Sequence, residues 1–168
     1  MAQDSTAERE RRKQERSQMG TVRVDVTHKG KKTQEAVYKS EDKTFVFVAD
    51  EPESRGGKGE GPSPLGYFIS GAATCLMMQY TNVLKDNPMR VTSMKLLARA
   101  HNDRGSRDFK DIVYQVDLTG TLSEADAENL ARQASDRCFV ENTLSKVIPI
   151  TTEVNLNGKK VFSFTREP

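Results

Sequence analysis

The chain has 168 residues, enough for one domain of ordinary size with its own hydrophobic core. Its 26 basic and 24 acidic side chains leave a net charge of +2, which gives no strong attraction to nucleic acid or to an anionic membrane surface. The longest apolar-rich stretch, residues 65–84, is interrupted by glycine and polar residues, so it does not predict a membrane span. The first residues lack the apolar run of a secretory signal. We therefore expect a cytoplasmic protein without nucleic-acid or membrane partners.

The N-terminal segment is strongly charged. Residues 7–18 read AERERRKQERSQ and carry no apolar stripe on any helical face. Such a segment has no surface to bury against a folded core. We therefore expect residues 1–20 to form a disordered or frayed helical tail, followed by a single domain over residues 21–168.

Strand patterns dominate the part of the domain that follows this tail. Residues 21–27 alternate with period two, residues 29–31 indicate a turn, and residues 33–39 are expected to return as the second arm of a hairpin. Residues 44–48 predict a third short strand. Residues 50–63 contain four glycines and two prolines, and this composition is typical of a loop.

Two helices are predicted in the remaining sequence. Ser63-Pro64 is a favourable helix start, and the helix is expected to end at Leu84 or Lys85. It is apolar on most of its circumference, so we expect it to be buried on several sides. A capping box over residues 123–126 begins the second helix, whose single apolar face ends at Cys138.

Four further strands complete the pattern. The last two flank Asn157-Gly158, which favours a tight type I′ turn. The sequence therefore predicts an α+β fold in which antiparallel sheets pack on two core helices. The expected strands are residues 90–102, 109–122, 148–156 and 159–164.

Cys75 and Cys138 are the two cysteines of the chain. They are too few for a disulfide scaffold or a thiolate zinc site, and His28 and His101 have no ligands at metal-binding spacing. The glycine-rich loop also lacks the phosphate-loop pattern. We therefore expect no metal and no cofactor. From the residues alone, the two cysteines are either inert buried thiols or a reversible redox pair.

Two segments resemble the OsmC/Ohr family. The first runs from Gly61-Pro62-Ser63-Pro64 to Cys75 and is similar to the family's proline turn followed by an apolar helix with a cysteine. The second runs from Cys138 to Leu144 and continues into residues 147–150. It is similar to the family's second cysteine segment, which leads into a strand. The separation of 63 residues between the cysteines also matches, and the first segment looks most like the subgroup with Gly-Pro-Ser-Pro before the helix.

The resemblance implies an intertwined homodimer with paired cysteine sites at its interface. In the peroxidase members, the first cysteine attacks a hydroperoxide and becomes a sulfenic acid. The second cysteine then forms a disulfide with it, and a dithiol reduces this bond. For this chain the resemblance implies Cys75 as the attacking thiol, Cys138 as the resolving thiol, and a small apolar organic hydroperoxide as substrate.

This sequence departs from the family pattern at the group that activates the attacking thiol. Peroxidase members oppose the thiolate with an Arg that a Glu holds, but here Leu65 and Gly66 occupy the positions of that Glu. Arg55 is the candidate cation in the preceding loop, and Phe139 replaces the proline that usually follows the second cysteine. The alternative is therefore an OsmC-like homodimer that binds a small apolar ligand or has a regulatory role without efficient peroxidase activity.

Overall fold

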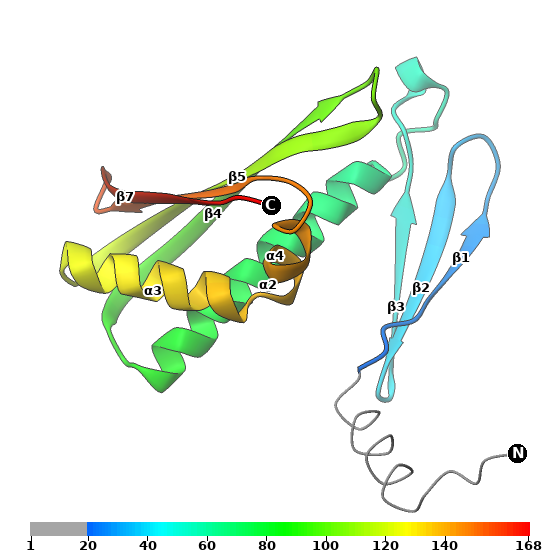
Figure 1. The fold of residues 1–168 in the computed structure, drawn as a ribbon. Helices are drawn as coiled ribbons and strands as arrows, with labels where there is room; N and C mark the ends of the chain where they lie inside the picture. The colour runs from blue at the N-terminus through cyan, green and yellow to red at the C-terminus, as the bar shows by residue number, and fades with distance from the viewer. Residues whose placement is uncertain (1–19) are drawn as a thin grey trace, which may run out of the picture. The chain divides into compact units, whose positions relative to one another are not determined.

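The computed structural model describes residues 20–168, which form parts of two compact units (Figure 1). The first unit ends at Ser63 and the second begins at Pro64. The charged tail predicted over residues 1–20 lies outside the described residues apart from Gly20. The single domain expected over residues 21–168 stays a prediction.

The described part of the first unit is built on a three-stranded antiparallel sheet. Its strands are β1 (Val24–His28), β2 (Gln34–Ser40) and β3 (Lys43–Ala49), in the order β1-β2-β3. All three strands that the sequence predicts are present. The expected loop follows β3 and contains one short 3-10 helix, η1 (Glu53–Arg55).

Asp50 organises this loop. Its buried carboxylate accepts hydrogen bonds from Thr33 Oγ1 at 3.2 Å and from the backbone amides of Glu51 at 2.8 Å, Lys58 at 3.0 Å and Glu60 at 3.2 Å. Burial alone would raise the pKa of Asp50, but these hydrogen bonds outweigh it and hold the pKa below its ordinary value. The backbone also closes tightly on itself here, because a Cβ on Gly57 would lie 1.7 Å from the carbonyl oxygen of Glu51. The glycine-rich loop therefore has a defined shape.

A four-stranded sheet forms one layer of the second unit. Its strands lie in the order β4-β5-β6-β7, and the outer neighbours pair antiparallel. The central pair, β5 and β6, is parallel, which differs from the antiparallel pairing expected from the sequence. The reason is that helices connect these two strands, and such a crossover returns the chain to the same end of the sheet. The strand bounds are Arg90–Asp103, Asp108–Thr121, Ile150–Leu156 and Lys159–Arg166.

The tight turn between β6 and β7 has the expected conformation. Asn157 and Gly158 have φ values of 50° and 83°, as a type I′ turn requires. The Asn157 side chain also bonds both backbone groups of Gly120, at 3.1 Å and 3.0 Å. This contact ties the turn to the end of β5.

Three helices cover one face of this sheet (Figure 1). They are α2 (Pro64–Asp86), α3 (Glu124–Arg137) and α4 (Phe139–Leu144). The start of α2 at Pro64 and the capping box of α3 at Ser123 are as predicted. The sequence pattern did not predict α4, a six-residue helix that follows Cys138 directly.

The core of the second unit lies between these helices and the inner face of the sheet. Alternate residues of β5 and β6 are buried, so one sheet face packs on the helices. On α2 only one face is buried, whereas Leu65, Phe68 and Met78 are exposed in the described chain. The sequence predicted burial on several sides, but α3 and the sheet cover one side only. The buried residues of α2 are Ala72, Leu76, Tyr80 and Val83.

None of the helices in residues 20–168 has the length and apolar character that a membrane crossing requires.

Candidate active site: a cysteine pair

The structure brings together the two cysteines that the sequence singles out. The Cys138 thiol donates to Cys75 Sγ, and the two sulfur atoms are 3.5 Å apart. The residues lie 63 positions apart in the chain and on different elements. Packing of α2 against the junction of α3 and α4 therefore creates the pair. Both cysteines are free thiols in the structure.

Backbone geometry fixes the position of each cysteine. Cys75 lies in the middle of α2, directly before the fully buried Leu76, and is itself half-buried. Cys138 ends α3 by donating its N–H to Ser135 O at 3.1 Å, and it begins α4 by accepting from Asn142 N at 2.9 Å. Its side chain is fully buried. One sulfur is therefore partly accessible and the other is enclosed.

The environment of Cys138 favours the neutral thiol. Burial raises its pKa to about 12, and the neighbouring Cys75 adds to this rise, whereas the backbone amide of Glu141 lowers it. The sequence located Cys138 only at the C-terminal end of a helix. In the structure it also begins α4, which explains why a backbone amide faces its sulfur.

We expect this environment to protect Cys138 from alkylation. At pH 8 a thiol with a pKa near 12 is about 10³-fold less ionised than an unperturbed cysteine, and the thiolate is the form that reacts. Iodoacetamide should therefore label Cys138 roughly 10³-fold more slowly in the native protein than in urea, as measured by peptide mass spectrometry. Equal rates in both conditions would contradict the buried, protonated state.

Polar groups gather around Ser135, three residues before Cys138, and sequence reasoning missed them. Glu141 is fully buried in α4, and its Oε1 accepts from Ser135 Oγ at 2.6 Å. Arg166 Nη1 donates to the same Ser135 hydroxyl and to its carbonyl oxygen, each at 3.2 Å. The signal that could have found Glu141 is its place three residues after Cys138, in a helical turn that begins in the core.

Arg55 lies in the other unit. It ends η1, and its Nη1 donates to Oε2 of Glu51, four residues earlier in the chain, at 3.3 Å. The side chain is largely exposed to solvent. Its expected role as the cation at the cysteine site stays a prediction.

The two histidines have partners of their own. His101 Nδ1 lies 2.5 Å from Asp111 Oδ1, across the paired strands β4 and β5. His28 Nδ1 lies 3.1 Å from Gln34 Nε2, across β1 and β2. Within residues 20–168, the structure contains no group of three His, Cys, Asp or Glu residues that could hold a metal ion.

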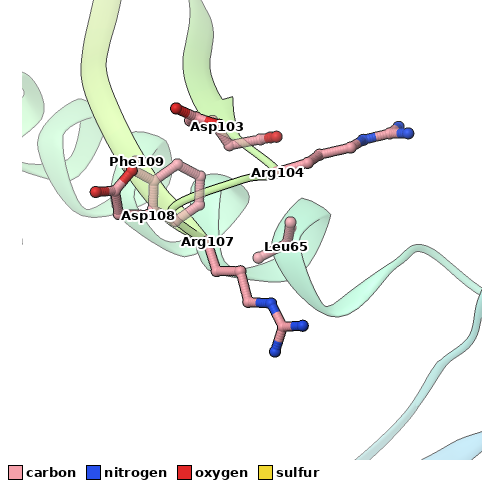
Figure 2. A pocket seen from close by; sticks show the side chains of 7 residues that line it. Leu65, Asp103, Arg104, Arg107, Asp108 and Phe109 are labelled. Atoms are coloured by element: carbon pink, nitrogen blue, oxygen red, sulfur yellow. The ribbon is translucent and has the colours of Figure 1, made fainter.

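A separate pocket lies at the tip of the β4–β5 hairpin. It has a volume of about 300 Å³ and is lined by Leu65, Phe109 and charged residues of the hairpin tip. Figure 2 shows that the guanidinium groups of Arg104 and Arg107 extend in different directions rather than toward one point. No cysteine lines this pocket. The cysteine pair is therefore the stronger candidate for chemistry.

These features define a class of protein: an α+β fold in which helices packed on one sheet bring two free thiols together. The chain belongs to the OsmC-like protein family, whose model matches residues 57–153. This match confirms the family resemblance drawn from the two cysteine segments and includes both cysteines. The resemblance to a particular subgroup stays a prediction. A search of the curated proteins found no match.

Solved structures support the same fold. An OsmC-like protein from Mycoplasma pneumoniae is 18% identical, with a TM-score of 0.72 over 82% of this chain and 97% of that one. An OsmC-like protein of unknown function from Vibrio cholerae is 16% identical, with a TM-score of 0.68 over 82% and 100%. An organic hydroperoxide resistance protein from Elizabethkingia anophelis is 15% identical, with a TM-score of 0.66 over 83% and 98%. These similarities confirm the predicted α+β, OsmC-like fold.

Proposed function

We propose that this protein reduces organic hydroperoxides with Cys75 as the attacking thiol and Cys138 as the resolving thiol, in defence against oxidative stress. The observation that carries the proposal is the 3.5 Å contact between the two sulfur atoms. The contact is directional, because Cys138 keeps its proton and donates it toward Cys75. Family membership and structural similarity to hydroperoxide resistance proteins add support.

The proposed reaction has three balanced steps. The Cys75 thiolate forms an S–O bond with the hydroperoxide, the O–O bond breaks, and the leaving alkoxide takes up a proton and departs as an alcohol. Cys138 then attacks the sulfenic acid at Cys75. An S–S bond forms, the S–O bond breaks, and the thiol proton leaves with the hydroxide as water. A dithiol reductant finally returns both thiols and becomes a disulfide itself.

The proposal gives Arg55 the task of stabilising the Cys75 thiolate. Within its own unit, Arg55 pairs with Glu51 at 3.3 Å, and the hydrogen bonds to Asp50 fix the loop that carries both residues. An Arg held by a Glu is the arrangement that the family resemblance implies. On this view, Glu51 supplies the carboxylate that is absent from positions 65 and 66.

Apolar side chains near Cys75 favour an apolar substrate. Ala73, Thr74 and Met77, on either side of it in α2, line a shallow hollow of about 410 Å³ together with Met94, Lys95 and Leu96 of β4, whereas Cys75 itself does not line this hollow. A bulky alkyl or aryl group gains from contact with such a surface. The proposal therefore assigns organic hydroperoxides, rather than hydrogen peroxide, as the preferred class.

The proposal is tested by following free thiols in the reduced protein. One equivalent of cumene hydroperoxide is expected to remove both thiols within seconds, whereas hydrogen peroxide acts more slowly. Mass spectrometry should then find a disulfide between Cys75 and Cys138. Thiols that persist in an excess of cumene hydroperoxide would contradict the peroxidase function.

A second candidate function is an OsmC-like protein that binds a small apolar ligand or has a regulatory role without efficient peroxidase activity. The absence of a carboxylate at Leu65 and Gly66 favours it, because the attacking thiol then lacks the family's usual support. Persisting thiols together with binding of an apolar fluorescent probe would support this alternative.

Under either function we expect a homodimer. The exposed side chains Leu65, Phe68 and Met78 lie on α2. A second copy of the chain is the occupant that we propose for this apolar surface, because α2 is also the helix that carries the cysteine. Sedimentation at micromolar concentration should give a species of twice the chain mass, and Phe68→Asp should shift it toward the monomer. A wild-type monomer would contradict this prediction.

A further inference from the structure

Cys138 lies at a junction between two helices. α3 ends at Arg137 and α4 begins at Phe139, so Cys138 alone separates them. Its backbone is extended, with φ −81° and ψ 111°, and this conformation interrupts the helical path. The place of the Cys138 side chain therefore depends on the contacts that fix α4 against the last turn of α3.

Ser135 makes hydrogen bonds on both sides of this junction. Its carbonyl oxygen accepts from the Cys138 N–H at 3.1 Å. Its hydroxyl donates to Oε1 of Glu141, in the first turn of α4, at 2.6 Å. Ser135 and Glu141 are both fully buried. A hydrogen bond between buried groups is strong because water does not compete for it, so this bond ties α4 to α3 across Cys138.

Arg166 connects the same serine to the sheet. It is the last residue of β7, whose C-terminal end reaches the junction of α3 and α4 (Figure 1). Its Nη1 donates to the hydroxyl and to the carbonyl oxygen of Ser135, each at 3.2 Å. A hydroxyl can accept one hydrogen bond while it donates another, and a charged donor strengthens the bond that it makes. The contacts therefore run continuously from the guanidinium through Ser135 to the Glu141 carboxyl group.

Stability alone does not account for the glutamate at this place. Within residues 20–168, the Ser135 hydroxyl is the one hydrogen-bond donor to the Glu141 carboxyl group, and Oε2 has no partner. Burial of a carboxyl group is costly unless its oxygens are bonded. An apolar side chain of similar size would fill the same space without this cost. What the glutamate adds is a fixed connection across the Cys138 junction.

We propose that Ser135, Glu141 and Arg166 are positioning residues that hold the Cys138 thiol against Cys75 and thereby set the rate of disulfide formation. This role rests on the proposed function and belongs to its second step. In that step the Cys138 sulfur forms the S–S bond, the S–O bond at Cys75 breaks, and the thiol proton leaves with the hydroxide as water.

The spacing of the two sulfur atoms explains why positioning matters. They are 3.5 Å apart in the reduced protein, whereas a disulfide bond is about 2.0 Å long. A short approach therefore completes the bond, provided that the junction stays in place. Reactions between groups held on one scaffold depend steeply on their placement, and an error of about 1 Å can slow them by on the order of 10²-fold.

Two substitutions of Glu141 separate geometry from charge. Glu141→Gln keeps an acceptor oxygen for Ser135 and loses the charge. Glu141→Leu fills a similar volume but offers no acceptor. The Ser135 hydroxyl can then turn to a backbone carbonyl of the preceding turn of α3, so we expect this variant to fold. A positioning role predicts that glutamine preserves disulfide formation and that leucine does not.

A single turnover measures the two chemical steps separately. Reduced protein is mixed with one equivalent of cumene hydroperoxide and quenched in acid at intervals, and mass spectrometry follows the sulfenic acid at Cys75 and the disulfide. Both variants should form the sulfenic acid at the wild-type rate. Glu141→Leu should form the disulfide about 100-fold more slowly, whereas Glu141→Gln should stay within about threefold of wild type. A wild-type disulfide rate in Glu141→Leu would overturn the proposal, and an equally slow Glu141→Gln would overturn it in favour of a role for the charge.

Arg132 provides a matched control for Arg166, since both arginines connect α3 with β7. The Arg132 guanidinium lies 4.7 Å and 5.1 Å from the ring centroids of Phe162 and Phe164, and it bonds another residue of α3 rather than Ser135. Arg166→Gln should slow disulfide formation about tenfold, because it removes hydrogen bonds from a charged donor. Arg132→Gln should keep the wild-type rate. Equal rates in these two variants would overturn the part assigned to Arg166.

Equilibration with glutathione distinguishes failure of the positioning role from failure of the proposed function. Oxidised glutathione takes two electrons from the thiol pair and becomes two molecules of reduced glutathione, so this reaction needs no peroxidase activity. Its equilibrium constant should be about 100-fold lower in Glu141→Leu than in wild type. A wild type that ignores the hydroperoxide but shows this difference sinks the peroxidase function and keeps the positioning role. An unchanged constant overturns the positioning role, and a wild type that forms no disulfide with either oxidant overturns both.

Near-ultraviolet circular dichroism establishes whether each variant is folded. Should Glu141→Leu not fold, Ser135→Ala takes its place, because alanine is favourable in a helix and the substitution removes the same hydrogen bond. It should show the same slow disulfide formation and the same unchanged first step. A wild-type disulfide rate in folded Ser135→Ala would overturn the proposal.

Discussion

Replacement of Cys75 by serine is expected to abolish hydroperoxide consumption, whereas replacement of Cys138 leaves a single turnover. Cys75 is the half-buried sulfur that accepts the hydrogen bond, and Cys138 is the enclosed sulfur that keeps its proton. Cys75→Ser should therefore consume no cumene hydroperoxide above background. Cys138→Ser should consume about one equivalent per chain and retain a sulfenic acid at Cys75, because no resolving thiol is present. The measurements are residual peroxide and the mass of each variant after dimedone treatment.

Either of two results would reverse this assignment. Oxidation of Cys138 before Cys75 would exchange the roles of the two thiols. A wild type that never forms the disulfide would leave the apolar binding function as the better account. His101→Asn is a suitable control, because His101 pairs with Asp111 on the paired strands β4 and β5 and has no proposed part in the reaction.

The sequence was sufficient to predict the elements that local signals define. Ser63-Pro64, the capping box at Ser123 and the Asn157-Gly158 turn each specify the backbone through neighbouring residues, and all three appear where they were expected. The parallel pairing of β5 with β6 was not predicted. No local residue specifies which strands become neighbours, since that choice depends on how the intervening helices cross the sheet.

The candidate site likewise has a part that the sequence predicts and a part that only the structure shows. The identity and spacing of Cys75 and Cys138 could be read from the sequence, because family similarity links them across 63 residues. Glu141 could not be found, since a lone Glu on a short helix is an unremarkable pattern. Its significance comes from complete burial and from an oxygen that lacks a partner among the described residues. Only tertiary structure reveals those properties.

Leu76→Ala is expected to cause a large loss of stability and to disturb the cysteine pair. Leu76 is fully buried on the inner face of α2, directly after Cys75, and belongs to the core that α3 and the sheet complete. Truncation of a buried leucine to alanine lowers the free energy of unfolding by about 2–5 kcal/mol, because apolar contacts are lost and a cavity remains. Urea unfolding at fixed protein concentration should show this loss as a lower midpoint.

Val147→Ala provides the control for that measurement, since Val147 is 70% exposed. This substitution should change the free energy of unfolding by no more than about 0.5 kcal/mol. A cavity beside Cys75 should also loosen the packing that holds the two sulfur atoms together and shields Cys138 from solvent. We therefore expect iodoacetamide to label Cys138 faster in Leu76→Ala than in wild type, under conditions in which both remain folded. A destabilised variant with unchanged labelling would mean that the enclosure of Cys138 depends on α3 and α4 rather than on packing of α2.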